Sequence, residues 1–257
     1  MGVDDDPLAI PRPSAGRVFD ASRRVRLADA SAGGRLRLDA CARYLQDIAN
    51  DDSRDAGTPN PTAWVARRTA IRVHRFPNYL DWLTLSTWCS GLGARWAERR
   101  YTVVDGGATL IDAATLWVHI DMATMRPINV PTGFDDSFGL AAGGRRISAR
   151  LHLPTKRPDD PTVATGWPLR FVDFDVLGHV NNSVYWAIVE EQLARLRALR
   201  APFTVTLEHH DAIDAGETVE VLVRDDPSGT VFDLWIVTST GKVTAVVRAD
   251  ASTTSRV

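Results

Sequence analysis

The segment Asp173-Phe-Asp-Val-Leu-Gly-His-Val-Asn-Asn-Ser-Val-Tyr185 directly precedes a strongly amphipathic stretch of this chain. It concentrates two aspartates, one glycine, one histidine and two asparagines. A glycine adopts a positive φ without steric cost, so Gly178 suits a tight turn. Asn181 or Asn182 is a good N-cap for a following helix. The segment therefore predicts a turn that leads into a helix N-terminus.

An earlier part of the chain repeats this pattern. Asp29 matches Asp173 and Gly34 matches Gly178, and both pairs stand 144 positions apart (173 − 29 and 178 − 34). Each half is expected to hold a short strand, at about 24–27 or 169–171, and then a long helix. The helices are expected at about 38–51 and from about 182 until Pro202, because apolar residues recur there at helical spacing.

A four-stranded meander is expected to follow each helix, because alternating apolar residues are divided there by glycine-bearing turns. The expected strands lie at about 64–76, 82–88, 96–104 and 110–120 in the first half, and at 203–209, 218–223, 231–237 and 243–248 in the second. A sheet that curls around a helix buries the helix's apolar stripe. The fold class is therefore α+β, with two copies of one unit mimicking a two-fold dimer.

Proline-rich sequence separates the two units, and it predicts a linker. We expect an N-terminal domain at 18–130, the linker at 131–167 and a C-terminal domain at 168–250.

Composition excludes several classes of function. The 257 residues have a net charge of −2, so no basic field attracts nucleic acid. No apolar run reaches 18 residues, so no membrane span is expected. Cys41 and Cys89 are too few for a disulfide framework or a metal cage, which favours a cytoplasmic protein. His209 and His210 are adjacent on a predicted strand and point to opposite faces, so no metal site is expected.

The chemistry of the opening segment lies in Asp175 and His179. A turn brings a carboxylate and an imidazole four residues apart together as a base or nucleophile and a hydrogen-bond donor. The helix N-terminus adds a site for the oxyanion of an ester or thioester, with N–H groups near Gly178 and Val180 as its donors. The alternative is that the aspartates solvate a loop and His179 caps a helix.

Several segments resemble one family in the right order: Tyr44-Leu45-Gln46-Asp47, Trp64-Val65, Thr206-Leu207-Glu208 and the opening segment. They resemble the hotdog-fold thioesterases, specifically the double-hotdog acyl-ACP thioesterases of plants and bacteria. The resemblance implies two tandem hotdog domains, each a long helix wrapped by an antiparallel sheet. It also implies hydrolysis of a fatty acyl thioester of acyl carrier protein in fatty acid biosynthesis, without metal or organic cofactor.

Asp175 and His179 match the catalytic acid and histidine of this family. The resemblance places Gly178, Val180, Asn181 and Asn182 against the substrate.

The first half has Ser31 and Arg35 at the two catalytic positions, so one active site per chain is expected. The first half would then supply the acyl pocket. Trp64 is a candidate for lining that pocket, with an ordinary core position as the alternative.

The chain departs from the family's pattern at two places. Leu177 replaces an asparagine, and a glutamate expected on the strand after the helix falls at Ala212 or Ile213. Asp211, the tentative third catalytic residue, or Asp214 would substitute for it, unless Asp175 acts alone.

Two rival functions remain: an acyl-CoA thioesterase with the same site, and a non-catalytic fatty-acyl binding module. Association into a homodimer is left open. On the second helix, Glu190 and Glu191 are expected to form a solvated face, with reach into a pocket as the alternative.

Overall fold

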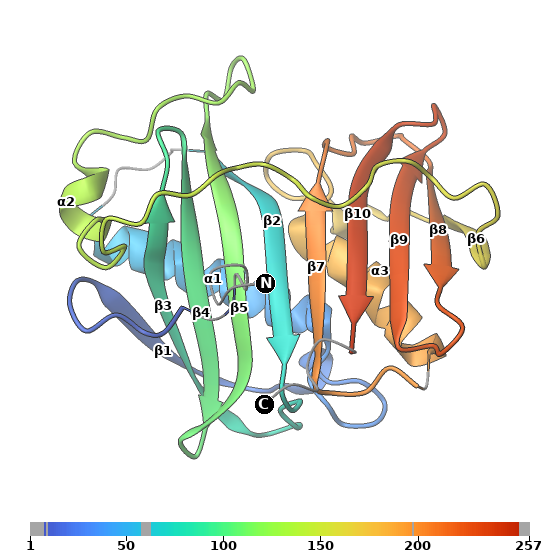
Figure 1. The fold of residues 1–257 in the computed structure, drawn as a ribbon, viewed down its shortest axis with the longest axis horizontal. Coiled ribbons are helices and arrows are strands. Elements are labelled where there is room, and N and C mark those ends of the chain that lie inside the picture. The colour runs from blue at the N-terminus through green and yellow to red at the C-terminus, as the bar shows by residue number, and fades with distance from the viewer. Residues whose placement is uncertain (1–7, 9, 58–62, 197, 252–257) are drawn as a thin grey trace.

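The computed structural model describes residues 8, 10–57, 63–196 and 198–251. Within them, one ten-stranded antiparallel sheet has the order β1-β3-β4-β5-β2-β7-β10-β9-β8-β6. Two long helices, α1 (Leu38–Asp55) and α3 (Asn182–Arg195), lie side by side on one face of this sheet (Figure 1). The predicted α+β class, with a curved sheet around a helix in each half, is confirmed.

Each half contributes five strands to the sheet. The first half holds β1 (Val18–Arg24), β2 (Ala63–Val73), β3 (Trp82–Leu92), β4 (Trp96–Asp105) and β5 (Ala108–Ile120). The second half holds β6 (Val163–Trp167), β7 (Phe203–His209), β8 (Val219–Asp225), β9 (Val231–Thr238) and β10 (Val243–Asp250).

The predicted four-stranded meander is wrong in its pairing. The first strand after each helix does not pair with the next strand along the chain. Instead β2 pairs with β5, and β7 pairs with β10, so only three consecutive strands form a meander in each half. Sequence periodicity locates a strand but does not identify its neighbour, because the pairing joins residues far apart along the chain.

The short strands before the two loops were also placed too late. β1 ends at Arg24, and β6 ends at Trp167 inside the range expected to be linker. A single 3-10 turn begins at the last residue of each expected strand, at Leu27–Asp29 and Phe171–Asp173. β6 pairs with β8 as β1 pairs with β3, so it completes the second half of the sheet.

An approximate two-fold axis relates the halves. β2 and β7 pair antiparallel at the centre of the sheet, with Ala70 opposite Thr206. These residues stand 136 positions apart (206 − 70), which is also the offset between the strand ends Val73 and His209 (209 − 73). Equivalent strands that pair antiparallel at equivalent residues are related by a two-fold axis through that pair. The single sheet therefore contains an internal pseudo-dimer.

The helices fill the concave side of the sheet. In α1 the stripe Leu38, Cys41, Leu45 and Ile48 is buried, as the helical spacing predicted. The end predicted for α3 is wrong, since the helix stops at Arg195 rather than continuing to Pro202. No helix among the described residues is long and apolar enough to cross a membrane.

The segment between the halves is tied to the sheet. It contains the short helix α2 (Phe134–Phe138) and then crosses the sheet face opposite the long helices (Figure 1). The buried carboxylate of Glu208 accepts hydrogen bonds from the N–H groups of His152 and Leu153 at 2.8–3.0 Å. The Arg145 guanidinium donates to buried Glu98 at 2.7 Å. These contacts give the connecting segment a fixed course, so it is not a free linker.

Candidate active site

Two equivalent loops lead into the helices: the first loop, residues 29–38, and the second loop, residues 173–182. Each closes with a glycine at positive φ, Gly34 at 83° and Gly178 at 77°. The N–H of Gly178 donates to the carbonyl of Asp175 at 3.0 Å, and Gly34 donates to Ser31 at 2.9 Å. The repeated aspartate and glycine of the sequence therefore mark a repeated turn.

Asp175 and His179 are joined through the main chain of this turn. The N–H of Asp175 donates to the carbonyl of His179 at 2.9 Å. The Asp175 carboxylate accepts the N–H of Leu177 at 2.9 Å and is half-buried. Among the described residues, no hydrogen bond joins the side chains of Asp175 and His179. The turn presents both groups to one cavity and leaves the imidazole to another partner.

That partner is Asp214, in the connection between β7 and β8. His179 Nε2 lies 3.3 Å from Asp214 Oδ1, and the two residues form an isolated β-bridge. Asp211, the other candidate carboxylate, lines the cavity, but its Oδ2 is paired with Lys242 Nζ at 2.5 Å. Of the two aspartates that the sequence left open, Asp214 is the one that contacts the histidine.

The two asparagines at the start of α3 have different positions. Asn181 is the N-cap, and its Oδ1 accepts the N–H and hydroxyl of Ser183 at 2.9 and 2.8 Å. Asn182, the first helical residue, lines the cavity. Asn181 therefore stabilises the helix N-terminus, while Asn182 belongs to the cavity wall.

The N–H groups expected to hold an oxyanion already have acceptors. Gly178 donates within the turn, and Val180 donates to the carbonyl of Ile213 at 3.1 Å. Val180 is buried and its side chain lines the cavity. This geometry assigns Gly178 to the shape of the turn and Val180 to the cavity wall, and it does not support an oxyanion role for either N–H.

The cavity has a volume of about 820 Å³ and is built from both halves of the chain. From the second loop it extends between α1 and the strands of the first half. The first-half wall mixes charged side chains, such as Arg54, Glu98 and Arg99, with a group of apolar ones: Trp64, Cys89, Ala97, Trp117, Ile120 and Phe134. Trp64 packs its ring against His119 and Phe134, with centroids 5.0 and 5.3 Å apart. This wall suits an acyl chain, and Trp64 lies where a pocket-lining residue was expected.

Sequence reasoning missed several polar residues of the cavity wall, namely Gln46, Arg67, Tyr185 and His209. Arg67 donates to the carbonyls of His209 and His210 at 2.6 and 3.3 Å, and burial lowers the pKa of its guanidinium. The internal repeat was the signal that could have identified Gln46, since it aligns this residue with Glu190 (190 − 46 is 144).

His209 is a buried neutral imidazole. Burial lowers its pKa to about 3, and its ring meets the edge of Tyr185 at a centroid distance of 4.7 Å. Burial also raises the pKa of the Tyr185 hydroxyl. Among the described residues, no group of three or more His, Cys, Asp or Glu side chains is arranged to hold a metal ion.

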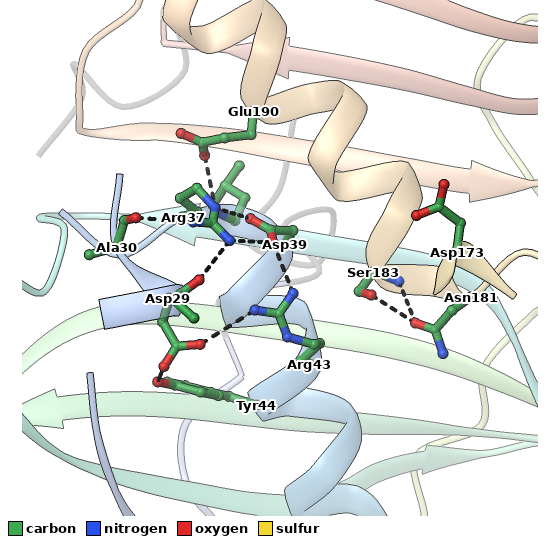
Figure 2. Close-up of polar contacts among 12 residues, drawn as sticks. Asp29, Ala30, Arg37, Asp39, Arg43, Tyr44, Asp173, Asn181, Ser183 and Glu190 are labelled. Carbon is green, nitrogen blue, oxygen red and sulfur yellow. Dashed lines mark hydrogen bonds and ion pairs between the residues drawn. The ribbon is translucent and has the colours of Figure 1, made fainter. Parts of the chain in front are cut away.

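The first loop lacks the catalytic pair and is filled by a side chain of the other half. Glu190 of α3 reaches the start of α1, where it accepts the N–H of Leu38 at 3.0 Å and pairs with Arg35 at 2.5 Å. Figure 2 shows this carboxylate above the first turn of α1. The solvated face predicted for Glu190 is wrong, because the residue is buried, although neighbouring Glu191 is exposed.

Comparisons with known proteins agree with this architecture. The acyl-ACP thioesterase N-terminal domain matches residues 16–138, and the acyl-ACP thioesterase C-terminal domain matches residues 156–252. An uncharacterised protein of Mycobacterium tuberculosis is 29% identical over 219 residues, covering 85% of this chain and 87% of that protein.

A plant relative and two solved structures carry names from the same family. An acyl-[acyl-carrier-protein] hydrolase of Cuphea viscosissima is 24% identical, covering 88% of this chain and 60% of the plant protein. The 12:0-ACP thioesterase of Umbellularia californica superposes with a TM-score of 0.76 at 20% identity, covering 91% and 96% of the two chains. An acyl-ACP thioesterase of Bacteroides thetaiotaomicron gives 0.73 at 16% identity, covering 91% and 97%. With the two domain matches covering most of its length, this chain belongs to the acyl-ACP thioesterase family, hydrolases that act on thioester bonds.

Proposed function

We propose that this protein hydrolyses fatty acyl thioesters of acyl carrier protein, with Asp175 and His179 as its reacting side chains. The observation that carries the proposal is one cavity lined by residues of both kinds that a thioester needs. Charged first-half residues such as Glu98 and Arg99 line it as well, but Asp175 and His179 supply reactive groups and Trp64, Trp117 and Phe134 supply apolar surface. A thioester needs both, because its reacting carbonyl is polar and its acyl chain is apolar.

Asp175 is the base that activates water. Its carboxylate accepts one hydrogen bond from within the loop and is half-buried, so lone pairs remain for a water molecule. The carboxylate takes a proton from water as the new C–O bond forms, and the carbonyl π electrons move to oxygen. The oxyanion then reforms the carbonyl as the C–S bond breaks, and the proton held by Asp175 passes to the departing thiolate. The products are a free fatty acid and the carrier thiol.

His179 positions the thioester. Its Nε2 is close to Asp214, and a carboxylate on one side of an imidazole orients the ring. His179 and Asp175 are fixed relative to each other by the main-chain hydrogen bond of the turn. Direct attack of Asp175 on the thioester carbon is the alternative chemistry, and it would pass through a mixed anhydride.

One kinetic series tests the function. Thiol release is measured on matched acyl-ACP and acyl-CoA substrates from octanoyl to octadecenoyl, with wild type, Asp175→Asn and His179→Ala. We expect turnover of acyl-ACP and a loss of about 10³-fold or more in both variants. Preference for acyl-CoA would transfer the same chemistry to the other carrier. No turnover on either series would favour a binding module, and near-wild-type rates in both variants would refute the assigned residues.

Isotope labelling separates the two chemical routes. A single turnover in ¹⁸O-water labels the fatty acid if water attacks directly. If Asp175 attacks and water then cleaves the anhydride at its aspartyl carbonyl, the first turnover places ¹⁸O in the Asp175 side chain; mass spectrometry of the peptide detects this label, which only the anhydride route can produce.

The structure also bears on how many copies of the protein are needed and on its compartment. Both halves of one chain build the cavity, so hydrolysis requires no second copy of the protein. Cys41 and Cys89 are buried free thiols, and burial raises their pKa values to about 12 and about 11. Unreactive free thiols support a reducing compartment, and we place the protein in the cytoplasm.

A further inference from the structure

The pseudo-two-fold axis makes Glu190 and Gln46 equivalent residues. Each is the ninth residue of its helix, counted from Leu38 in α1 and from Asn182 in α3. The two helices pack against each other, so the ninth residue of one helix approaches the first residue of the other. Glu190 makes this contact with Leu38, and the pseudo-two-fold axis places Gln46 toward Asn182 in the same way; both residues line the cavity.

The first loop shows what this arrangement binds. A negatively charged oxygen of Glu190 receives the N–H of Leu38 at 3.0 Å, and the second oxygen receives the Arg35 guanidinium at 2.5 Å. The first N–H groups of a helix have no intrahelical acceptor and carry the positive end of the helix dipole. The first turn of α1 is thus an anion site filled by the protein's own carboxylate.

The equivalent position in the second half is open. Within the described part of the chain, neither the N–H of Asn182 nor the Gln46 amide has a hydrogen-bond partner. Both residues line the cavity together with Asp175 and His179. Where the first half has a carboxylate, the second half has a neutral amide, so no protein charge occupies the site.

We propose that the side-chain amide of Gln46 and the main-chain N–H of Asn182 bind the thioester carbonyl oxygen and hold the negative charge that develops on it. The inference rests on the proposed hydrolysis at this cavity, and it makes Gln46 a catalytic residue delivered by the half that lacks the catalytic pair. Oriented donors at a developing oxyanion stabilise the transition state more than the ground state. Gln46 therefore acts on kcat rather than on KM.

The choice of glutamine over glutamate follows from charge. A glutamate at position 46 would accept the N–H of Asn182, as Glu190 accepts that of Leu38, and would repel the oxyanion. Gln46→Glu is therefore a self-inhibited variant. Its inhibition deepens as the new carboxyl group ionises, whereas loss of the side chain in Gln46→Ala has no such dependence.

The experiment compares wild type, Gln46→Ala and Gln46→Glu on the most rapidly hydrolysed acyl-ACP, with kcat and KM measured from pH 5 to pH 8. We expect Gln46→Ala to lower kcat about 10- to 100-fold with KM nearly unchanged. The ratio of Gln46→Glu to wild-type kcat should fall about tenfold or more from pH 5 to pH 8. Taking the ratio removes the titration of groups common to both proteins: Asp175, His179, Asp211, His210, Arg67 and Tyr185.

Glu190→Gln is the matched control, because it makes the reverse change at the equivalent position of the first half. It should lower the melting temperature and leave kcat within about twofold of wild type, since Glu190 pairs with Arg35 and not with substrate. Circular dichroism confirms that each variant is folded, and Gln46→Glu keeps the side-chain shape if Gln46→Ala does not fold.

Two results would overturn the inference: a kcat for Gln46→Ala within about twofold of wild type, or a Gln46→Glu ratio that does not change with pH. If Asp175→Asn is inactive in the same assay, the proposed function survives that outcome and only the role of Gln46 is lost.

Discussion

The two loops that lead into α1 and α3 have one backbone and two chemistries. In both, an aspartate accepts the N–H three residues before it, and a glycine at positive φ closes the turn. The side chains differ where the substrate would lie: Ser31 against Asp175, Arg35 against His179. The comparison separates the residues that build the turn from those that react. The turn requires only an aspartate and a glycine, so the first loop has the same shape with Ser31 and Arg35 in place of the acid and the imidazole.

The same comparison explains why the cavity reaches the second loop and not the first. At the first loop, the carboxylate of Glu190 fills the space in front of the helix N-terminus. At the second loop, Gln46 leaves that space to a ligand. A pseudo-dimer with two identical halves would have two sites or none. With different side chains at a few equivalent positions, the proposed site lies at the second loop, and the first half contributes apolar side chains to the cavity.

Exchanging side chains between the loops should have the largest effect. Asp175→Ser with His179→Arg gives the second loop the side chains of the first. It should lower kcat/KM on acyl-ACP by about 10³-fold or more, because the base and the imidazole are both lost. The melting temperature should change little, since the main-chain hydrogen bonds of the turn remain. Steady-state kinetics and thermal unfolding measure the two quantities.

The reciprocal exchange is the control. Ser31→Asp with Arg35→His should not produce a second active site, because Glu190 still occupies the first loop. In the background of the inactive second loop, it should restore no activity. Recovery of turnover there would show that the catalytic pair suffices and that the filled site is unimportant.

The next largest effect is expected from the loss of Asp52, a buried acid near the end of α1. Asp52 is buried, pairs with the buried Arg99, and accepts Arg17 Nε at 2.6 Å. Its equivalent in the second half is Leu196, where α3 has ended. Asp52→Ala leaves Arg99 buried without a carboxylate, and it should lower the free energy of unfolding by about 3–5 kcal/mol. Urea unfolding measures this difference.

Asp55→Ala is the matched control one turn further along. Asp55 pairs with Arg17 at 2.5 Å, but its side chain is 60% exposed. An exposed pair of this kind contributes about 1 kcal/mol or less. Equal losses for the two variants would mean that burial does not determine the strength of this ion cluster.

A buried histidine distinguishes the central strands of the two halves. His209 ends β7, and Val73 ends the equivalent strand β2. Burial lowers the pKa of His209 to about 3, so between about pH 6.5 and pH 3 the unfolded chain binds the proton and the folded protein does not. The free energy of unfolding therefore falls as the pH falls through this window, by up to about 1.4 kcal/mol per pH unit from this group.

His209→Val should reduce that acid sensitivity. Between pH 7 and pH 5, wild type should lose about 2 kcal/mol more than the variant, measured by urea unfolding at both values. His210→Val is the comparison, because His210 is the adjacent histidine and is only half-buried, although burial lowers its pKa in the same direction. Parallel pH profiles for wild type and His209→Val would contradict a buried neutral imidazole.

Local features of the fold could be predicted from the sequence, whereas long-range pairings could not. The start of α1, the strand β7 and the turn at Gly178 follow from periodicity and glycine chemistry that a short window contains. The position of β2 beside β5 and the burial of Glu190 depend on partners elsewhere, and Arg35 stands 155 positions from Glu190. The sequence places β6 in the linker because five residues among prolines, with Gly166 as the fourth of them, have little strand character of their own.

In the candidate site, too, the residues close together in sequence could be predicted, and those brought in from the other half were harder to identify. Asp175, His179 and Asn182 are close in sequence and line one cavity, whereas Trp64 and Gln46 come to it from the other half. Trp64 was identified by its type and place in a strand. The sequence around Gln46 has no motif that marks a functional residue. Only the internal repeat, which aligns Gln46 with Glu190, connects it to the second loop. The choice between Asp211 and Asp214 depended on the course of the chain after β7, which periodicity does not describe.

The smallest effect is expected at the carboxylate beside His179. Asp214→Asn removes a negative charge 3.3 Å from the imidazole, but the Asp214 side chain is 71% exposed, so water screens much of the interaction. We expect kcat to fall about two- to fivefold, with the loss confined to orientation of the ring. The first loop has Asn78 opposite Arg35 in the equivalent bridge, so the variant also makes the second loop resemble the first. Asp211→Asn in the same assay should leave kcat unchanged, because Asp211 pairs with Lys242 and does not orient the His179 ring. A larger loss for Asp211→Asn than for Asp214→Asn would reassign the supporting carboxylate to Asp211.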